Sequence, residues 1–242
     1  MEKISVILPV YNESNCIANT FDEVLHYSKN KPHYQFIFVN DGSTDNTKAI
    51  LEKKLAASQT SKIKIVSYNA NQGKGYAVKK GIESSWGEII CFIDSDLAYS
   101  LDHLEFLVDK LEMFDVAIGC RNMMPDRIKK VKFKRRIAGK IFNLISRKIL
   151  NLKHPDMQAG IKGFTKEAAE ILFSKQTLKG YCFDVELIYL ANKYGYNIVE
   201  IPAIVSDLHL HKNSKVNLVV DSLKMLFSLL KIKLNDTLGV YE

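Results

Sequence analysis

The feature that most restricts the fold of this chain is the alternation of short apolar runs with helical patterns through its first half. Each apolar run has the length of a strand, and each intervening segment repeats its apolar residues at helical spacing. Strands that alternate with helices pair in parallel, so the sequence predicts an α/β fold with a doubly wound, mostly parallel sheet. The expected strands are residues 5–10, 36–40, 63–67, 89–94 and 116–119, and the expected helices are residues 15–29, 44–57, 75–85 and 102–114.

The pattern changes after residue 119. We expect one domain over residues 1–217, in which residues 127–155 form a basic amphipathic segment. An amphipathic C-terminal helix and tail should follow at residues 218–242. The other expected elements are strands at 160–164 and 198–205, helices at 165–173 and 183–194, and amphipathic helical patterns at 127–152 and 216–234.

Three of the expected strands end in acidic side chains. Glu13 follows the first strand, Asp41 follows the second, and Asp94 and Asp96 follow the fourth. The carboxyl ends of parallel strands share one edge of a sheet, and ligands bind beyond that edge. We therefore expect these carboxylates to surround one site.

The segment Asp94-Ser95-Asp96 is the sharpest local feature. Two carboxylates two residues apart can reach one cation, and Mg²⁺ prefers one or two carboxylates together with substrate phosphates. A metal at this point would neutralise a diphosphate leaving group. The alternative is a simple turn or an N-cap for the following helix.

The segment after the second strand admits two interpretations. Asp41, at the strand end, is placed to bind a base or a ribose, whereas Ser43 and Thr44 are typical of a turn and a helix cap. The segment Gly73-Lys74-Gly75 is neither a dinucleotide fingerprint nor a P-loop.

Positive charge is concentrated in one segment. Residues 127–155 contain 11 Lys or Arg and no Asp or Glu, while the whole chain has a net charge of +7, so the remainder carries −4. This pattern favours an anionic partner, such as an anionic membrane surface. A solvated basic face or a nucleic-acid patch is the alternative. Only Phe133 and Phe142 interleave with the basic residues, which disfavours nucleic acid.

The cysteines and the apolar segments indicate a compartment. The four cysteines form no CxxC pair and no zinc pattern, so we expect reduced thiols, as in the cytosol. The N-terminus shows no signal-peptide pattern, and no apolar stretch reaches the ~18 residues that a spanning helix needs. We expect a peripheral protein on the cytoplasmic face of the membrane.

The order of the motifs resembles a known family more than any single motif does. Residues 9–13, 39–45, 71–75 and 94–96 follow one another as in family 2 glycosyltransferases of the GT-A fold. The second half is similar to polyprenyl-phosphate glycosyltransferases, above all to the dolichyl-phosphate glucosyltransferase and mannosyltransferase branches. The segments that carry this second similarity are Gly119-Cys120-Arg121, residues 156–164, residues 183–187 and Ser214-Lys215.

The resemblance implies a role for each matching residue. Asp94 and Asp96 would hold Mg²⁺ or Mn²⁺, and Arg121 would bind the acceptor phosphate with help from Arg135. Two departures, Ala98 in place of a Gln and His209 in place of an Arg, weaken a mannosyl assignment. The residues implied at the nucleotide sugar are Pro9, Tyr11, Glu13 and Asp41 at the nucleoside, Ser95 near the ribose or diphosphate, Lys74, and Lys215 at the diphosphate.

The resemblance thus implies a metal-dependent inverting transferase that moves a hexose, with glucose preferred, to a polyprenyl phosphate. The donor would be a nucleotide sugar of the UDP-glucose or GDP-mannose type. A lipid phosphate is already an anion at neutral pH and needs positioning rather than a general base. One alternative is a family 2 glycosyltransferase acting on a glycan hydroxyl, with Asp184 or Glu186 as the base. The other is a basic nucleic-acid-binding α/β module.

Overall fold

The computed structural model describes residues 2–124, 133–206 and 218–242, and for residues 133–138 and 218–223 it describes the backbone alone. Of the single residues considered above, His209, Ser214 and Lys215 therefore lie outside the described residues. The backbone of Arg135 is described, but its side chain is not.

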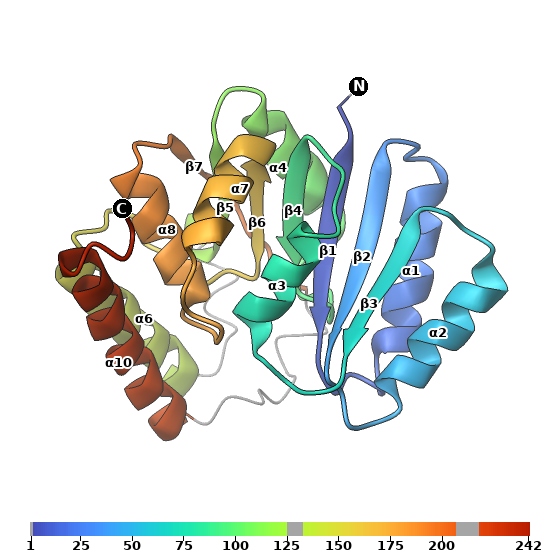
Figure 1. The fold of residues 1–242 in the computed structure, drawn as a ribbon, viewed down its shortest axis with the longest axis horizontal. Helices are drawn as coiled ribbons and strands as arrows, with labels where there is room; N and C mark the ends of the chain where they lie inside the picture. Colours follow the sequence, from blue (N-terminus) through green and yellow to red (C-terminus); the bar gives the residue numbers. More distant parts are fainter. Residues whose placement is uncertain (1, 125–132, 207–217) are drawn as a thin grey trace.

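A seven-stranded sheet in the order β3-β2-β1-β4-β6-β5-β7 forms the centre of the molecule (Figure 1). The predicted parallel pairing is confirmed for every strand except β6, which runs antiparallel between β4 and β5. The strands are β1 (Ile4–Val10), β2 (Tyr34–Asp41), β3 (Ile63–Tyr68), β4 (Ile89–Ile93), β5 (Val116–Cys120), β6 (Ile161–Thr165) and β7 (Ile198–Pro202).

Helices cover both faces of this sheet, as a doubly wound arrangement requires. Side chains of a strand alternate between the two faces, so Val6 and Leu8 of β1 join one core cluster and Ile7 joins the other. The predicted elements are confirmed, with ends that differ by up to three residues, apart from the helical pattern at 127–152, whose first six residues lie outside the described residues. Helices α1 (Ile17–Lys29), α2 (Thr47–Ser58) and α4 (His103–Leu111) cover one face, and α3 (Lys74–Ile82), α7 (Lys166–Lys175) and α8 (Phe183–Lys193) cover the other.

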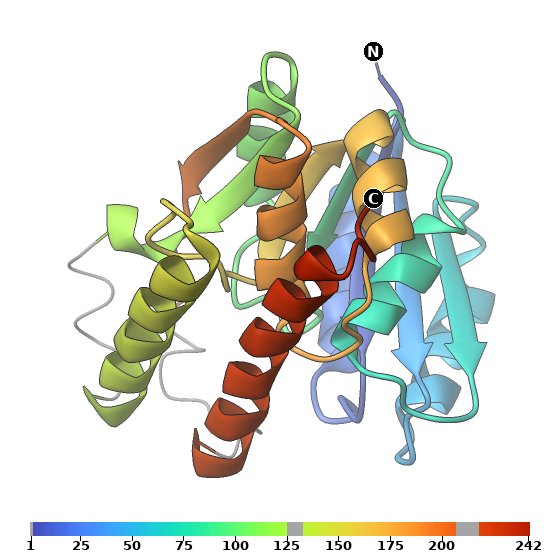
Figure 2. The same ribbon diagram turned by 60° about the vertical axis from the view of Figure 1, so that its left-hand side comes forward.

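Two longer helices, α6 (Phe133–Leu150) and α10 (Leu218–Thr237), lie side by side beyond α8 (Figures 1 and 2). Leu229 and Ile232 of α10 are buried in the same core cluster as α8, and so is Tyr241 after the helix. The predicted boundary before residue 218 stays a prediction, but the helix packs on the body of the molecule. In the described ranges, no helix is both long enough and apolar enough to cross a bilayer.

Candidate active site

The carboxyl ends of β1, β2 and β4 meet at one edge of the sheet, the lower edge in Figure 1. Asp94 directly follows β4, and its N–H donates to the carbonyl of Gly160 at 2.9 Å. The N–H of Leu97 closes a turn onto the Asp94 carbonyl at 3.0 Å, and the N–H of Ala98 donates to Asp96 Oδ1 at 3.1 Å. Helix α4 has no side-chain cap, so the N-cap alternative for this segment is wrong. The turn places both carboxylates at the edge.

A lysine lies beside the first of these carboxylates. Lys74 Nζ is 2.7 Å from Asp94 Oδ1 and faces the rings of Phe92 and Phe183 at 5.7 and 5.8 Å. Burial alone would lower the pKa of Lys74, but the carboxylates of Asp94 and Asp184 raise it above its usual value. Lys74 is therefore a stable cation at the edge where an anionic donor would bind.

The residues at this edge fit a hard divalent cation. Asp94 and Asp96 supply the carboxylates that Mg²⁺ takes together with substrate phosphates. The missing side chain of Gly160 makes room for the first carboxylate, since a Cβ there would lie 1.8 Å from Asp94 Oδ2. Within the described part of the chain, no group of three or more His, Cys, Asp or Glu side chains forms a metal site. A cation bound by these two aspartates would need further ligands, such as phosphate oxygens.

The loop that follows β1 takes its shape from the loop that follows β2. The N–H of Asn12 donates to Ser43 Oγ at 3.0 Å, and Asn12 Oδ1 accepts the N–H of Thr44 at 2.8 Å. Asn12 has φ +52°, a conformation that asparagine tolerates better than most residues. The prediction that Ser43 and Thr44 act as a helix cap is wrong, because α2 begins only at Thr47 and these two residues bind Asn12 instead.

Asp41, at the end of β2, is buried and holds a third loop at this edge. Its carboxylate accepts hydrogen bonds from Asn71 Nδ2 at 2.8 Å, from the N–H of Gln72 at 2.7 Å and from the N–H of Gly73 at 2.9 Å. Gly73 has φ +101°, which only glycine adopts without strain. Asp41 therefore shapes the loop that leads to Lys74, and its contact with a base or ribose stays a prediction.

The other residues expected at the donor lie along the same edge. Pro9 lies in β1, Tyr11 is exposed beyond the end of that strand, and Glu13 precedes α1. Ser95 is buried, and its carbonyl accepts a hydrogen bond from Thr20 Oγ1 at 2.8 Å. The backbone between the two aspartates is therefore tied to α1.

Arg121 begins a short 3-10 helix (Arg121–Met123) after β5 and is held by a buried carboxylate. Its Nε and Nη2 each lie 2.7 Å from an oxygen of Asp156, and its N–H donates to Asp156 Oδ2 at 2.9 Å. Burial would raise the pKa of Asp156, but the charge and the hydrogen bonds of Arg121 lower it below its usual value. The side chain of Arg121 is still 37% exposed, so the guanidinium is both fixed and accessible.

Asp184 and Glu186, the two candidate bases, point into the protein. Glu186 is fully buried, and its carboxylate accepts hydrogen bonds from the N–H and hydroxyl of Thr177, the N–H of Leu178 and the hydroxyl of Tyr241. Asp184 is 3% exposed and pairs with the buried Lys162. The structure therefore does not bring Glu186 to the strand-end site. Asp184 is buried close enough to Lys74 for their charges to interact.

Four residues that sequence reasoning left without a role contribute to this geometry. Asp156, Gly160 and Lys162 lie in the segment that resembles the family, but only the fold shows their partners. His103 is buried, and its Nε2 accepts the N–H of Ile204 at 3.1 Å, which ties α4 to the segment after β7. Nothing in the sequence around His103 indicates this contact.

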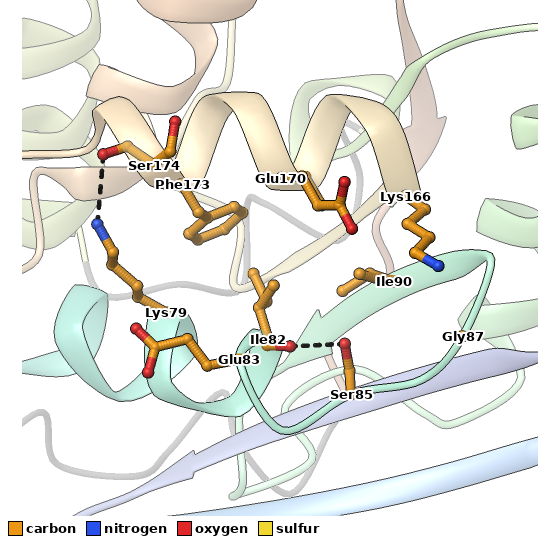
Figure 3. A pocket seen from close by; sticks show the side chains of 11 residues that line it. Lys79, Ile82, Glu83, Ser85, Gly87, Ile90, Lys166, Glu170, Phe173 and Ser174 are labelled. Carbon is orange, nitrogen blue, oxygen red and sulfur yellow. Dashed lines mark hydrogen bonds between the residues drawn. The ribbon is translucent and has the colours of Figure 1, made fainter.

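A cavity of about 440 Å³ lies between α3 and α7, far from the carboxyl ends of the strands (Figure 3). Ile82, Ile90 and Phe173 form its apolar part, and charged side chains surround them. No predicted site residue lines this cavity, so it is separate from the candidate site. The charged side chains are Lys79, Glu83, Lys166 and Glu170.

Comparison with known proteins identifies close relatives of this chain. Residues 5–173 match the family model described as glycosyl transferase family 2. The chain is 28% identical to the dolichyl-phosphate beta-glucosyltransferase of Dictyostelium discoideum, over 99% of this chain and 76% of that protein. It is 30% identical to the dolichyl-phosphate beta-glucosyltransferase of Saccharomyces cerevisiae, again over 99% of this chain and 76% of that protein.

Solved structures confirm the GT-A fold. The glucosyl-3-phosphoglycerate synthase of Mycobacterium tuberculosis in complex with UDP has a TM-score of 0.68 at 21% identity, over 96% of this chain and 80% of that chain. The same synthase with Mn²⁺, UDP and glucosyl-3-phosphoglycerate has a TM-score of 0.65 at 21% identity, with the same coverage. The family model extends from β1 into α7 and includes Asp94, Asp96 and Arg121. This chain therefore belongs to glycosyl transferase family 2 and is a glycosyltransferase.

Proposed function

We propose that this protein transfers glucose from UDP-glucose to a polyprenyl phosphate at a membrane surface, with the help of a divalent cation. The observation that carries the proposal is the joint placement of Asp94, Asp96 and Lys74 at the strand-end edge. Two carboxylates and a lysine suit a diphosphate donor that brings a metal. The names of the relatives, dolichyl-phosphate beta-glucosyltransferases, support glucose and a lipid phosphate.

The reaction would exchange one bond at the anomeric carbon for another. An oxygen of the acceptor phosphate forms a bond to that carbon while the bond to the diphosphate oxygen breaks, and UDP leaves with the bonding electrons. In-line attack inverts the carbon, so an α-linked donor gives a β-linked product. Asp94 and Asp96 would hold Mg²⁺ or Mn²⁺, which when bound stabilises the charge on the departing diphosphate. Lys74 would contact the same diphosphate.

The nucleoside is proposed to lie along the ends of β1 and β2. Pro9, Tyr11, Glu13 and Asp41 border this stretch of the edge, and the hydrogen-bonded loops around them provide a fixed surface. The roles of Ser95 near the ribose or diphosphate, of Lys215 at the diphosphate and of Arg135 at the acceptor rest on the resemblance of the sequence.

The burial of Asp184 and Glu186 favours a phosphate acceptor over a glycan hydroxyl. A hydroxyl needs a general base within hydrogen-bond reach, and both carboxylates are engaged inside the protein. A phosphate instead needs a cation in a fixed place. Arg121, held by Asp156 and partly exposed, is proposed to supply it.

Helices α6 and α10 are proposed to rest on the membrane. Figure 2 shows the pair extending toward the same side as the carboxyl ends of the strands. Amphipathic helices with cationic flanks lie in the interface of anionic bilayers, where each nearby Lys or Arg contributes about 1 kcal/mol. Residues 127–132 of the basic segment lie outside the described residues. The exposed side chains are Ile141, Leu144, Leu226, Phe227, Leu230 and Leu234, with Lys140, Arg147, Lys148, Lys224, Lys231 and Lys233 around them.

The side of the membrane is proposed from the cysteines. All four, Cys16, Cys91, Cys120 and Cys182, are free thiols in the structure. Disulfides are rare in the cytosol, so free thiols support the cytoplasmic face.

A transfer assay tests the proposal. The purified protein is incubated with polyprenyl phosphate in anionic vesicles, Mg²⁺ or Mn²⁺, and labelled UDP-glucose or GDP-mannose in parallel. We expect label in the organic phase from UDP-glucose, and none when the lipid or the metal is left out. Preferential transfer from GDP-mannose would overturn the choice of donor. Transfer to a glycan but not to the lipid would overturn the choice of acceptor.

A further inference from the structure

A second ion pair lies behind the pair of Lys74 and Asp94. Lys162 Nζ is 2.6 Å from Asp184 Oδ1, and the two side chains are 0% and 4% exposed. Lys162 also donates to the carbonyl of Ala159 at 2.8 Å. Lys162 and Asp184 are therefore fully enclosed, and a substrate does not reach them.

The two ion pairs are packed around the same aromatic ring. The ammonium groups of Lys74 and Lys162 face Phe92 at 5.7 and 5.5 Å, and Lys74 also faces Phe183, the neighbour of Asp184 in sequence. The charges interact across this cluster. The carboxylate of Asp184 attracts the ammonium group of Lys74, and the ammonium groups of Lys74 and Lys162 repel each other. From the edge inward, the charges are negative, positive, negative and positive.

Stability alone does not account for the inner pair. Two buried charges lose their hydration, and replacing such a pair by apolar residues of similar size is often neutral or stabilising. Lys162 and Asp184 come from β6 and α8, and the outer pair comes from α3 and the end of β4. The inner pair therefore holds one positive and one negative charge in fixed positions near the candidate metal site.

We propose, on the basis of the metal site proposed above, that Lys162 and Asp184 are positioning residues that act through Lys74 and set the cation affinity of Asp94 and Asp96. A divalent cation and Lys74 compete for the carboxylate of Asp94. Asp184 offers Lys74 a second partner, so that Lys74 can leave Asp94 when the cation arrives. Lys162 limits this attraction by neutralising Asp184.

The two inner residues should therefore have opposite effects. Binding of Mn²⁺ in the presence of UDP is measured from the electron paramagnetic resonance signal of free Mn²⁺. Asp184→Asn removes the second partner of Lys74 and should weaken Mn²⁺ binding about fivefold or more, the lower range of a coupling between two sites. Lys162→Met leaves Asp184 unneutralised and should strengthen binding by a similar factor. Effects in the same direction, or equal affinities, overturn the proposal.

A Lys74→Met background separates action through Lys74 from the direct field of the charges. The direct field persists without Lys74, whereas a positional effect disappears. We expect the two substitutions to change Mn²⁺ affinity by less than about twofold in this background. Persistence of the full effect would overturn the role of Lys74 as the intermediary.

The double variant Lys162→Met/Asp184→Asn covers the case in which a single variant does not fold. It leaves no unpaired buried charge, so it should fold. Because Lys162 acts only through Asp184, the double variant should bind Mn²⁺ as weakly as Asp184→Asn, about fivefold below the wild type. Affinity within about twofold of the wild type would show that the two charges act on the cation directly through their field, and it would overturn the proposal. If the wild type itself fails to bind Mn²⁺ with UDP, the proposed metal site fails and this proposal fails with it.

Discussion

The strand-end edge and the helix pair α6–α10 are built in different ways. At the edge, neighbouring loops are joined by short hydrogen bonds to side chains, as between Asn12 and Ser43 or between Asp41 and Gly73. The helix pair is held by apolar packing, with Leu229 and Ile232 buried, while other large apolar side chains stay in solvent. Hydrogen bonds of fixed geometry suit a site that must place reacting groups, and an open apolar face suits a surface that only needs to adhere.

Removing a candidate metal carboxylate from the strand-end edge should cause the largest loss of activity. Asp96→Ala should lower the transfer rate at least about 10³-fold, because the leaving diphosphate loses its charge stabilisation. The fold should persist, since the change removes one of two neighbouring carboxylates. Transfer rates and thermal unfolding measure both effects. Asp102→Ala, at an exposed carboxylate nearby, is the matched control. Activity near the wild-type level in EDTA would contradict the metal role.

A single methyl group should test how closely the edge is packed. In Gly160→Ala the new Cβ would lie 1.8 Å from Asp94 Oδ2, so the carboxylate must move. A displacement of about 1 Å in an active site costs about 10²-fold in rate, and we expect a loss of that order in kcat/KM. Gly180→Ala is the control, because its Cβ would meet nothing within 4 Å. Equal activity of both variants would contradict the tight packing.

Arg121, which is held by Asp156, should affect the acceptor alone. Arg121→Ala removes a charge-assisted contact worth about 1.5–3 kcal/mol, so the KM for polyprenyl phosphate should rise about 10- to 100-fold. The KM for the nucleotide sugar should change little. Steady-state kinetics with each substrate varied in turn gives both values. A larger rise for the donor would place Arg121 at the diphosphate.

The helix pair should be sensitive to loss of apolar area and not to geometry. Phe227→Ser with Leu230→Ser removes two exposed side chains, and binding to anionic vesicles should fall about tenfold or more. Transfer to a short, water-soluble polyprenyl phosphate should be unchanged. Vesicle flotation at low and high salt measures the first effect. Phe106→Ser on α4 is the control, and an equal loss there would show that adhesion is not specific to α6 and α10.

Acid should loosen the edge slightly. Burial alone would raise the pKa of Asp45, but hydrogen bonds from Thr47 and Ser14 lower it from 3.8 to about 2. Because the folded pKa is depressed, this stabilisation is present above about pH 4 and is lost as the pH falls toward 2. Asp45→Asn should lower the free energy of unfolding by about 1 kcal/mol at pH 7.

Urea unfolding at several pH values measures the contribution of Asp45. The difference between Asp45→Asn and the wild type should shrink as the pH falls from 4 to 2. A difference that is the same at pH 7 and pH 2 would contradict the role of the ionised carboxylate.

The fold was predictable to the extent that its signals are local. Apolar runs and helical periodicity lie within short segments, so the strands, the helices and their alternation follow from the sequence. The antiparallel insertion of β6 between β4 and β5 does not follow, because it depends on contacts between distant segments. The misassigned cap at Ser43 and Thr44 has the same origin, since both residues bind Asn12, which lies in another loop.

The candidate site also has a part that the sequence predicts and a part that depends on contacts between distant segments. Asp94 and Asp96 could be predicted because a strand end places them, and Arg121 because its segment resembles the family. The partners of these residues, Lys74 and Asp156, could not be paired with them from sequence, since each pair joins separate elements. Burial also separates residues that look alike in sequence, and Glu186 is enclosed although its segment resembles the family as well as any other.

The position of β6 has a consequence for shortened forms of the chain. Among the strands that the structure describes, β5 pairs with β6 and β7, which both come later in the sequence, and β4 needs β6 on its outer side. A fragment that stops after β5 would therefore leave the edge of β4 open and β5 unpaired. Open edges of apolar strands associate with other chains, so such a fragment should aggregate rather than fold. Because Lys162 lies on β6 and Gly160 directly precedes it, closing the sheet also completes the surroundings of Asp94.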